Sequence, residues 1–436
     1  MNKKIITTLS FLVALSVSSY SQAEEVIGLD GIFQTKAPTE VTAAKASRLA
    51  LLTWADNPES VRYEVEIFRG LPADLDRNTP VENPLYHNQK IYSNKVLIDM
   101  STLPDDTEGI LYWRVRPIDA DWEGLAPFSA PMEVRSTMKP ISRNAPYPNV
   151  YHPENGSTLL YPVYSYAGNP GASRYEVEVT KEYPENLENA KPSQYRVWSA
   201  ETSLSNVYDS QSRIGTYYWR VRGMDKAGNS VGIWSLPEKV RSHPSEHYQV
   251  GIFGDSITQG GGHLYHSPAD MTYSYVSYLD FPAVNMGRSG DTTEMMEDRF
   301  DRDVLPFHVK YLLIMGGIND LRMGADPQKV IQHLEAIREK CLHHGITPIL
   351  MTIVPINPEN IQKYYGETTY ENWRESVDIV NTYIKSQPHI DTAAPFAAFE
   401  VMPSELAMDG IHGDWNAKQM IAGAINREMG KIMSGL

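Results

Sequence analysis

The chain of 436 residues has a single cysteine, Cys341. One cysteine excludes an intrachain disulfide framework, so stability must come from packed cores. Cys341 lies on the apolar face of a predicted helix and is interpreted as a small core residue rather than a reactive thiol. A chain of this length has room for two to four such cores.

Long apolar runs are also scarce. Residues 5–17 are apolar, follow two lysines and precede a small-x-small site at 21–23, which predicts a secretory signal peptide over 1–23. This segment is too short to span a bilayer, and no later one has the length and apolarity of a membrane helix. The single cysteine, Cys341, lies far from the cleavage site, so no lipidated cysteine follows the signal peptide. We therefore expect an exported protein, periplasmic or extracellular, without a membrane span.

Basic clusters are missing as well. The chain carries 39 Lys and Arg against 54 Asp and Glu, a formal net charge of −15 that becomes −17 once Lys3 and Lys4 leave with the signal peptide. This like-signed field makes nucleic acid and strongly anionic polymers poor partners. The sequence gives no indication of the oligomeric state.

The first half of the chain repeats itself. "RYEVEIF" at 62–68 returns as "RYEVEVT" at 174–180, and the "YWRVR" block at 112–129 returns at 218–235. Alternating apolar and charged residues predict strands, so two all-β sandwich modules are expected at 26–138 and 141–243, joined by proline-rich segments. Trp54, Trp113, Trp219 and Trp234 are predicted to fill their cores, with a carbohydrate-binding surface as the alternative. The pattern resembles fibronectin type III modules.

After residue 247 the pattern alternates between strands and helices. Five apolar runs, with helices between them, predict a parallel sheet covered by helices on both faces. The runs lie at 250–253, 281–286, 311–315, 348–354 and 390–396. Predicted helices include 326–344, capped by Asp326 and stopped by Gly345, and 416–433.

Polar residues follow the ends of these strands. Ser256 follows the first in "GDSITQG", two glycines follow the second in "NMGRSGDTT", and Asn319 follows the third in "MGGINDL". Asp409 and His412 precede the last helix in "MDGIHGDWN". Ligands bind at the carboxyl ends of parallel strands, so these groups should converge on one edge.

The residue types match the needs of acyl transfer. A serine hydroxyl needs a base, a histidine base needs a carboxylate to orient it, and the oxyanion needs N–H donors. The four blocks resemble those of the SGNH (GDSL-type) hydrolase family. The resemblance covers 247–436 and implies a flavodoxin-like three-layer α/β/α sandwich with a five-stranded parallel sheet.

The resemblance also implies the site residues, by position. Ser256 would be the nucleophile, His412 the general base and Asp409 its partner. Asn319, the Ser256 amide and a glycine amide would form the oxyanion hole. Gly290 fits the family block better than Gly287, but the sequence leaves this choice open. Gly413 stands where the family often has proline, which predicts a looser loop around His412.

Other residues have less specific interpretations. Trp415 is a candidate substrate contact because it lies three residues after His412. Asp255 and Asp320 are expected to be structural. His263 and His266 lack a carboxylate cluster and make a poor metal site, so no metal and no cofactor are expected. Tyrosines at 265, 273, 275 and 278 fit a half-buried helix surface as well as a binding site.

The sequence therefore predicts an exported serine esterase, with O-acetyl removal from carbohydrate as the favoured activity. A short-chain carboxylesterase, thioesterase or lysophospholipase is the alternative. A binding protein on an inactive hydrolase scaffold is a further hypothesis. The expected partners are a small ester or an acetylated glycan.

Overall fold

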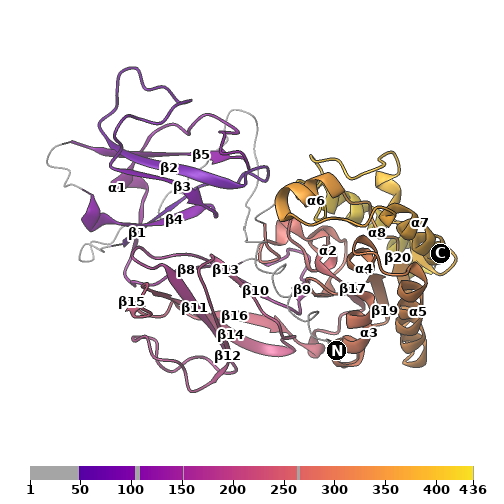
Figure 1. Ribbon diagram of the computed structural model, residues 1–436. Coiled ribbons are helices and arrows are strands. Elements are labelled where there is room, and N and C mark those ends of the chain that lie inside the picture. Colours follow the sequence, from indigo (N-terminus) through magenta and orange to yellow (C-terminus); the bar gives the residue numbers. More distant parts are fainter. Residues whose placement is uncertain (1–48, 104–108, 151, 263–265, 436) are drawn as a thin grey trace, which may run out of the picture.

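The computed structural model describes residues 49–103, 109–150, 152–262 and 266–435. Two β-rich parts, module 1 (49–141) and module 2 (147–242), precede a C-terminal domain (250–435) of alternating strands and helices (Figure 1). The predicted signal peptide at 1–23 lies outside the described residues. No helix within the described ranges is long and apolar enough to cross a bilayer.

Module 1 consists of two antiparallel sheets around one apolar core. One sheet has the order β3-β2-β5-β6 and the other β4-β1-β7. Trp54 and Trp113 are buried in this core, as predicted. The elements are β1 Leu49–Thr53, β2 Arg62–Arg69, β3 Tyr86–Ile91, β4 Lys95–Asp99, η2 Met100–Thr102, β5 Leu111–Ile118, β6 Met132–Glu133, α1 Val134–Thr137 and β7 Lys139–Ile141.

Module 2 has a similar arrangement, with sheets β13-β10-β8 and β12-β11-β14-β15, and β16 paired to β14. Trp219 lies in its core. The resemblance of both modules to fibronectin type III stays a prediction. The elements are β8 Tyr147–Asn149, β10 Val163–Ala167, β11 Arg174–Thr180, β12 Arg196–Thr202, β13 Asn206–Tyr208, β14 Gly215–Met224, β15 Ser230–Val231, β16 Glu238–Ser242 and η4 Pro244–Glu246.

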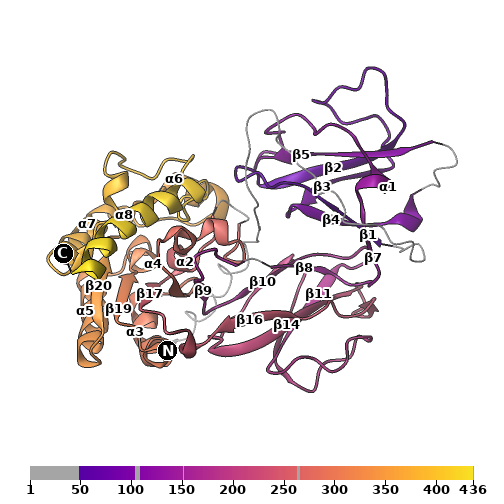
Figure 2. The same cartoon turned by 180° about the vertical axis from the view of Figure 1, so that it is seen from behind.

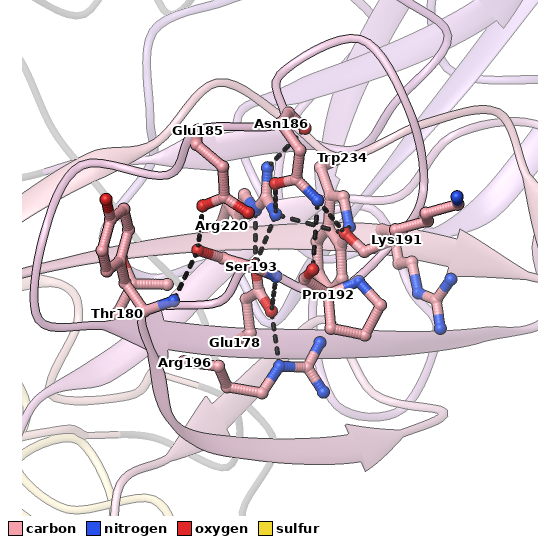
Figure 3. A network of polar contacts seen from close by, with 12 residues as sticks. Glu178, Thr180, Glu185, Asn186, Lys191, Pro192, Ser193, Arg196, Arg220 and Trp234 are labelled. Carbon is pink, nitrogen blue, oxygen red and sulfur yellow. Dashed lines mark hydrogen bonds and ion pairs between the residues drawn. The ribbon is translucent and has the colours of Figure 1, made fainter.

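The charged face of each repeat strand is buried rather than solvated. In module 2, Glu178 is fully buried and binds Arg196 and Arg220 (Figure 3). Arg220 also donates to the carbonyl oxygen of Asn186, which ties the loop after β11 onto the sheet. Trp234 is fully buried, as predicted, but it lies outside the apolar cluster and packs over Arg220, with 4.7 Å from the Arg220 Cζ to the ring centroid. Buried charges are tolerated because each has a partner.

A parallel sheet of order β21-β20-β19-β17-β18-β9 forms the centre of the C-terminal domain. Its strands from residue 250 onward are β17 Val250–Gly254, β18 Ala283–Gly287, β19 Tyr311–Met315, β20 Thr347–Met351 and β21 His389–Ile390. Numbered along the chain, these five follow the order 2-1-3-4-5, the flavodoxin-like arrangement. All five predicted strands are present, although the fifth is shorter than predicted and is followed by η8 Ala394–Phe396.

Helices cover both faces of this sheet. On one face α5 contacts both α3 and α7, while α8 contacts η5, η6 and β21 on the other. α5 begins after Asp326, whose side chain caps it, and its buried face includes Cys341. The helical elements are α2 Ser256–Gln259, η5 Met271–Tyr273, η6 Tyr275–Tyr278, α3 Thr293–Asp303, η7 Leu305–Phe307, α4 Ile318–Arg322, α5 Pro327–His343, α6 Pro358–Tyr365, α7 Trp373–Lys385 and α8 Trp415–Ser434.

The sixth strand corrects the expected strand count. β9 (Thr158–Leu159) pairs in parallel with Val284 and Asn285 of β18 and lies between module 2 and the rest of the sheet (Figure 2). Just after β9, Tyr161 donates its hydroxyl to Asp303 of α3 at 2.5 Å, and its carbonyl oxygen accepts from Gln259 at 2.9 Å. A segment from the range predicted for the second module thus completes the central sheet.

Module 1 contacts the C-terminal domain through the loop between β1 and β2. The carbonyl oxygen of Pro58 accepts a hydrogen bond from the Tyr273 hydroxyl at 2.6 Å, and the carbonyl oxygen of Ser60 lies 3.1 Å from His266 Nε2. The rings of His266 and Tyr273 stack, with centroids 3.7 Å apart. These contacts place the end of module 1 beside α2 and α6 (Figures 1 and 2).

Candidate active site

Ser256 is the first residue of α2, immediately after the central strand β17. Asp255 caps this short helix by accepting from the Ile257 amide at 2.9 Å. A Cβ at Gly254 would lie 2.3 Å from the carbonyl oxygen of Met315 and 2.3 Å from Thr258 Oγ1. The turn therefore requires glycine before Asp255, and it directs Ser256 to the carboxyl edge of the sheet.

The structure brings Ser256, His412 and Asp409 together. Ser256 Oγ lies 2.9 Å from His412 Nε2, across 156 positions of the chain. His412 Nδ1 lies 2.8 Å from Asp409 Oδ2. A hydroxyl, an imidazole and a carboxylate in this line can pass a proton from the hydroxyl to the ring while the carboxylate stabilises the resulting charge.

Asp409 is held in its ionised form. Its Oδ1 accepts from the backbone amides of Ile411 and His412 at 2.8 and 2.7 Å, and its Oδ2 accepts from the Tyr365 hydroxyl at 2.8 Å. Burial alone would raise the pKa of Asp409, but the charge and hydrogen bonds of His412 and the amide of Ile411 outweigh burial and lower it. The carboxylate can thus orient His412 without taking up a proton itself.

Asn319 in α4 lies on the same edge of the sheet. Its Nδ2 donates to the carbonyl oxygen of Asp291 at 3.0 Å, and its Oδ1 accepts from Arg322 Nε at 3.3 Å. These two bonds fix which end of the amide is the donor. An amide nitrogen carries two hydrogens, so one remains to bind an oxyanion.

The structure separates the two glycines between which the sequence could not choose. The amide of Gly287 donates to Asn285 Oδ1 at 2.9 Å, and a Cβ at Gly287 would lie 2.2 Å from the backbone nitrogen of Gln259. Gly290 has a φ of +81° and open space where its Cβ would be. Gly287 is therefore committed to packing, and the assignment of the oxyanion donor to Gly290 stays a prediction.

Three residues that support this site carry no motif in the sequence. Tyr365, the last residue of α6, binds Asp409 as described above. Two positions later, Glu367 binds Arg322 Nη1 at 2.6 Å, and Arg322 in turn binds the Asn319 amide. Residues 365–367 thus hold both the carboxylate and the amide. The helix-stopping Gly366 was the only local signal that the chain turns here.

The loop around His412 is enclosed, contrary to the looseness predicted from Gly413. A Cβ at Gly413 would lie 2.7 Å from Ala417 Cβ, so the start of α8 packs directly on this residue. Gly262 approaches from the other side, and a Cβ there would lie 2.7 Å from the carbonyl oxygen of Gly413. Close packing of the backbone replaces the ring of a proline as the restraint.

The remaining candidates lie around this centre or away from it. Trp415 begins α8, and its indole Nε1 is buried without a hydrogen-bond partner among the described residues. His266 is buried against module 1, whereas His263 and Tyr265 lie outside the described residues. Within the described ranges, no group of three or more His, Cys, Asp or Glu is arranged to hold a metal ion. Tyr273 and Tyr275 are buried, so they do not form an open surface.

Several ionisable groups lie beneath the site. Asp320 accepts from the Thr293 amide at 3.0 Å. Burial raises the pKa of Asp255 to about 7. Burial lowers the pKa of Lys418 to about 8, although the negative charges of Asp409 and nearby carboxylates act in the opposite direction. Burial also raises the pKa of Cys341 to about 12, which leaves this thiol unreactive.

Known proteins resemble the part of the chain that carries this site. Residues 252–414 match the model of the GDSL-like Lipase/Acylhydrolase family. This part of the chain is a GDSL-like acylhydrolase domain. A curated relative, the uncharacterized lipoprotein YqeF of Bacillus subtilis, is 35% identical over 119 residues, which are 24% of this chain and 49% of the relative. The chain thus spans about half the length of that protein.

Several solved structures are similar to the acylhydrolase domain. A lipase/acylhydrolase from Enterococcus faecalis is 24% identical, with 42% of this chain and 95% of that chain covered and a TM-score of 0.35. A GDSL-like lipase from Bacteroides thetaiotaomicron is 17% identical over 43% and 90%, with a TM-score of 0.34. A catalytic mutant of an acetylxylan esterase from Geobacillus stearothermophilus is 21% identical over 42% and 93%, with a TM-score of 0.32.

Proposed function

We propose that the protein is a serine esterase that cleaves carboxylic esters through an acyl-enzyme. The observation that carries the proposal is the line of two short contacts from Ser256 Oγ through His412 to Asp409, at 2.9 and 2.8 Å. The family match over residues 252–414 supports the same reaction. Ser256 is the nucleophile, His412 the general base and Asp409 its orienting partner.

In this proposal Ser256 Oγ attacks the ester carbonyl carbon while His412 Nε2 takes the hydroxyl proton. The oxyanion that forms accepts hydrogen bonds from the amides of Ser256 and Gly290 and from Asn319 Nδ2. His412 then protonates the departing alcohol, and the acyl group stays on Ser256. Water, deprotonated by His412, attacks the acyl-enzyme and releases the acid.

We propose O-acetylated carbohydrate as the substrate. Its support is the resemblance of an exported esterase joined to β-sandwich modules to enzymes that deacetylate polysaccharides. A short-chain carboxylesterase, thioesterase or lysophospholipase is the alternative. The proposed location is outside the cytoplasm, supported by the signal-peptide pattern at 1–23 and by a Bacillus subtilis relative named as a lipoprotein.

The test is acetate release from acetylated xylan and pectin, compared with hydrolysis of 4-nitrophenyl esters of increasing chain length. Ser256→Ala should lose about 10⁴-fold or more of the turnover. Asn319→Ala should lose roughly 10²–10³-fold, because it removes one oxyanion donor. Full hydrolysis of an acetyl ester by Ser256→Ala would refute the assignment.

The alternative of an inactive binding scaffold has its own test. A fluorophosphonate probe reacts with a serine only if a neighbouring base activates it. Labelling of the wild-type protein that disappears in Ser256→Ala would exclude an inactive scaffold. Absence of labelling, in protein with a cooperative unfolding transition, would instead support it.

A further inference from the structure

Modules 1 and 2 contain the same turn after their "YWRVR" strands. In module 1 the Asp119 amide donates to the carbonyl oxygen of Glu123, and Asp119 Oδ1 accepts from the amides of Asp121 and Glu123 at 2.9 and 2.8 Å. In module 2 Asp225 makes the equivalent bonds with Ala227 and Asn229 at 2.8 and 2.9 Å. The two turns can therefore be compared position by position.

The fourth residue of the turn has a left-handed backbone in both copies. Module 2 has Gly228 there, with a φ of +87°, and module 1 has Trp122, with a φ of +72°. Glycine adopts this conformation without strain, whereas a bulky L-residue adopts it at a cost in free energy. Trp122 is 44% exposed, so burial of its ring compensates for only part of that cost. A strained and exposed tryptophan indicates a role other than stability.

The ring of Trp122 is nevertheless held in place. The Arg62 guanidinium lies against one face, with its Cζ 3.6 Å from the ring centroid. Arg62 is 2% exposed, and its Nη2 donates to the carbonyl oxygens of Asp119 and Ala120, both at 2.9 Å. Trp122 is thus a pre-positioned aromatic surface, and little side-chain freedom remains to be lost when a ligand binds.

This surface lies on the side of module 1 that meets the acylhydrolase domain. Arg62 follows Ser60 by two residues, and Ser60 contacts His266 as described above. On the other side of the turn, the pKa of Lys363 in α6 is raised, chiefly by the Tyr364 hydroxyl and also by the Asp121 carboxylate. Both views show this end of module 1 beside α2 and α6, the elements next to the triad (Figures 1 and 2).

We propose that Trp122 stacks against a sugar ring of a neutral polysaccharide and so holds the alcohol portion of the ester that Ser256 cleaves. This inference rests on the proposed function. A pyranose ring has apolar C–H faces that match an indole face, and its hydroxyls can donate to carboxylates. Asp121 and Glu123 are exposed beside Trp122 and would repel uronate-rich or phosphorylated chains. Arg62 already occupies one face of the indole, which disfavours a cationic ligand.

The test uses Trp122→Gly, which gives module 1 the residue of its twin turn. Removal of strain should keep or raise the Tm, so misfolding does not confuse the result. The KM for acetylated xylan should rise at least tenfold, and the loss of kcat/KM on this polymer should exceed that on 4-nitrophenyl acetate at least tenfold. Tyr183→Ala, which removes another exposed aromatic from module 2, is the matched control and should leave both substrates unaffected.

A binding measurement separates this inference from the proposed function. In the full-length Ser256→Ala protein, migration through gels that contain xylan, glucomannan or hydroxyethyl cellulose should be retarded by at least one polymer. Adding Trp122→Gly should abolish the retardation. No retardation by any of the three polymers, or equal retardation with and without Trp122, would overturn the proposal that Trp122 binds a sugar ring, even if the esterase is active. Loss of activity in Ser256→Ala alone tests only the esterase.

Discussion

Module 2 joins the acylhydrolase domain through both main chain and side chains, because β9 extends the central sheet and the Tyr161 hydroxyl donates to Asp303 in α3. Module 1 joins it through two carbonyl oxygens, of Pro58 and Ser60, that accept from side chains beside the triad. The two modules share a sequence pattern, but they bind the C-terminal domain at different places: module 1 at His266 and Tyr273, and module 2 at β18, α3 and η6. Modules with one sequence pattern thus meet the same domain in two ways, one by extending its sheet and one by accepting hydrogen bonds from its side chains.

The largest expected effect concerns the attachment of module 2. Asp303 is fully buried and accepts from Tyr161, Arg299 at 3.2 Å and Arg302 at 2.8 Å. Asp303→Ala would remove the acceptor of the Tyr161 hydroxyl and one of the two carboxylates that bind the buried Arg299, which keeps Asp291. The loss of these charged hydrogen bonds should lower the free energy of unfolding by about 1.5–3 kcal/mol. Urea unfolding followed by circular dichroism measures this. Asp301→Ala, at an exposed position of the same helix, should change it by less than about 0.5 kcal/mol.

A loss below about 1 kcal/mol for Asp303→Ala would contradict the idea that this network holds module 2 to the sheet, because hydrogen bonds to a charged buried group contribute more than that.

The two attachments should respond to pH in opposite directions. Burial raises the pKa of Asp56 in module 1 to about 7, and burial with the nearby Asp56 charge raises that of Asp270. In the folded protein these carboxyl groups keep protons that they lose in the unfolded chain. The free energy of unfolding that they contribute therefore decreases as pH rises from about 4 to 7. Burial would raise the pKa of Asp303, but Arg302, Tyr161 and Arg299 lower it, so its contribution is lost only as pH falls below the unfolded value.

Asp56→Asn sharpens this contrast. An amide stays neutral, so the variant should be more stable than wild type at pH 8, on the order of 1–2 kcal/mol, and similar to it at pH 4. Thermal unfolding at both pH values measures the difference. Asp74→Asn, at an exposed position of module 1, is the control. Equal stability of Asp56→Asn and wild type at pH 8 would show that Asp56 is ionised without cost.

Tyr365 supports the triad from within the acylhydrolase domain itself. The effect of removing this support can be compared with the effect of removing the contact of module 1. Tyr365→Phe removes the 2.8 Å hydrogen bond to Asp409 and should lower kcat roughly tenfold, the equivalent of about 1.4 kcal/mol, with little change in KM. Steady-state kinetics with 4-nitrophenyl acetate measure it. Tyr364→Phe changes the preceding tyrosine and should retain wild-type kcat. A Tyr365→Phe defect confined to KM would argue against a positioning role.

The smallest effect is expected at the contact of module 1. Tyr273→Phe removes the hydrogen bond to the Pro58 carbonyl oxygen, worth about 1 kcal/mol. Hydrogen exchange of the amides at 57–61 should become faster, while that at 158–161 should not change. Tyr278→Phe is a matched control, because its hydroxyl binds Thr272 within the same domain. An equal increase in hydrogen exchange at both segments would contradict the proposed difference between the two attachments.

Much of the site could be predicted because strand ends are readable in the sequence. Ser256, Asn319 and His412 each follow a strong strand or precede a strong helix, and parallel strands bring such positions to one edge. Tyr365, Arg322 and Glu367 could not be predicted in this way. They act through side-chain contacts between segments about 45 positions apart, and no spacing rule encodes such contacts.

The limits on predicting the fold have similar causes. β9 has two residues, too few for a periodic pattern, and its partner β18 lies about 125 positions later. The sequence also could not show that the Gly287 amide is already bonded to Asn285, because only coordinates reveal such a contact. Glu64 and Glu66 follow a pattern that usually indicates a solvated face, yet both are buried, because loops and arginines cover that face.

The two-residue strand β9 has a consequence for any attempt to move the catalyst between proteins. A fragment beginning at residue 247 would leave the outer edge of β18 without its neighbour, and bare sheet edges recruit other edges and aggregate. Gene fusions and truncations that cut between the second repeat and the serine would thus yield a self-associating enzyme, whereas cuts upstream of residue 153 would preserve the protected edge.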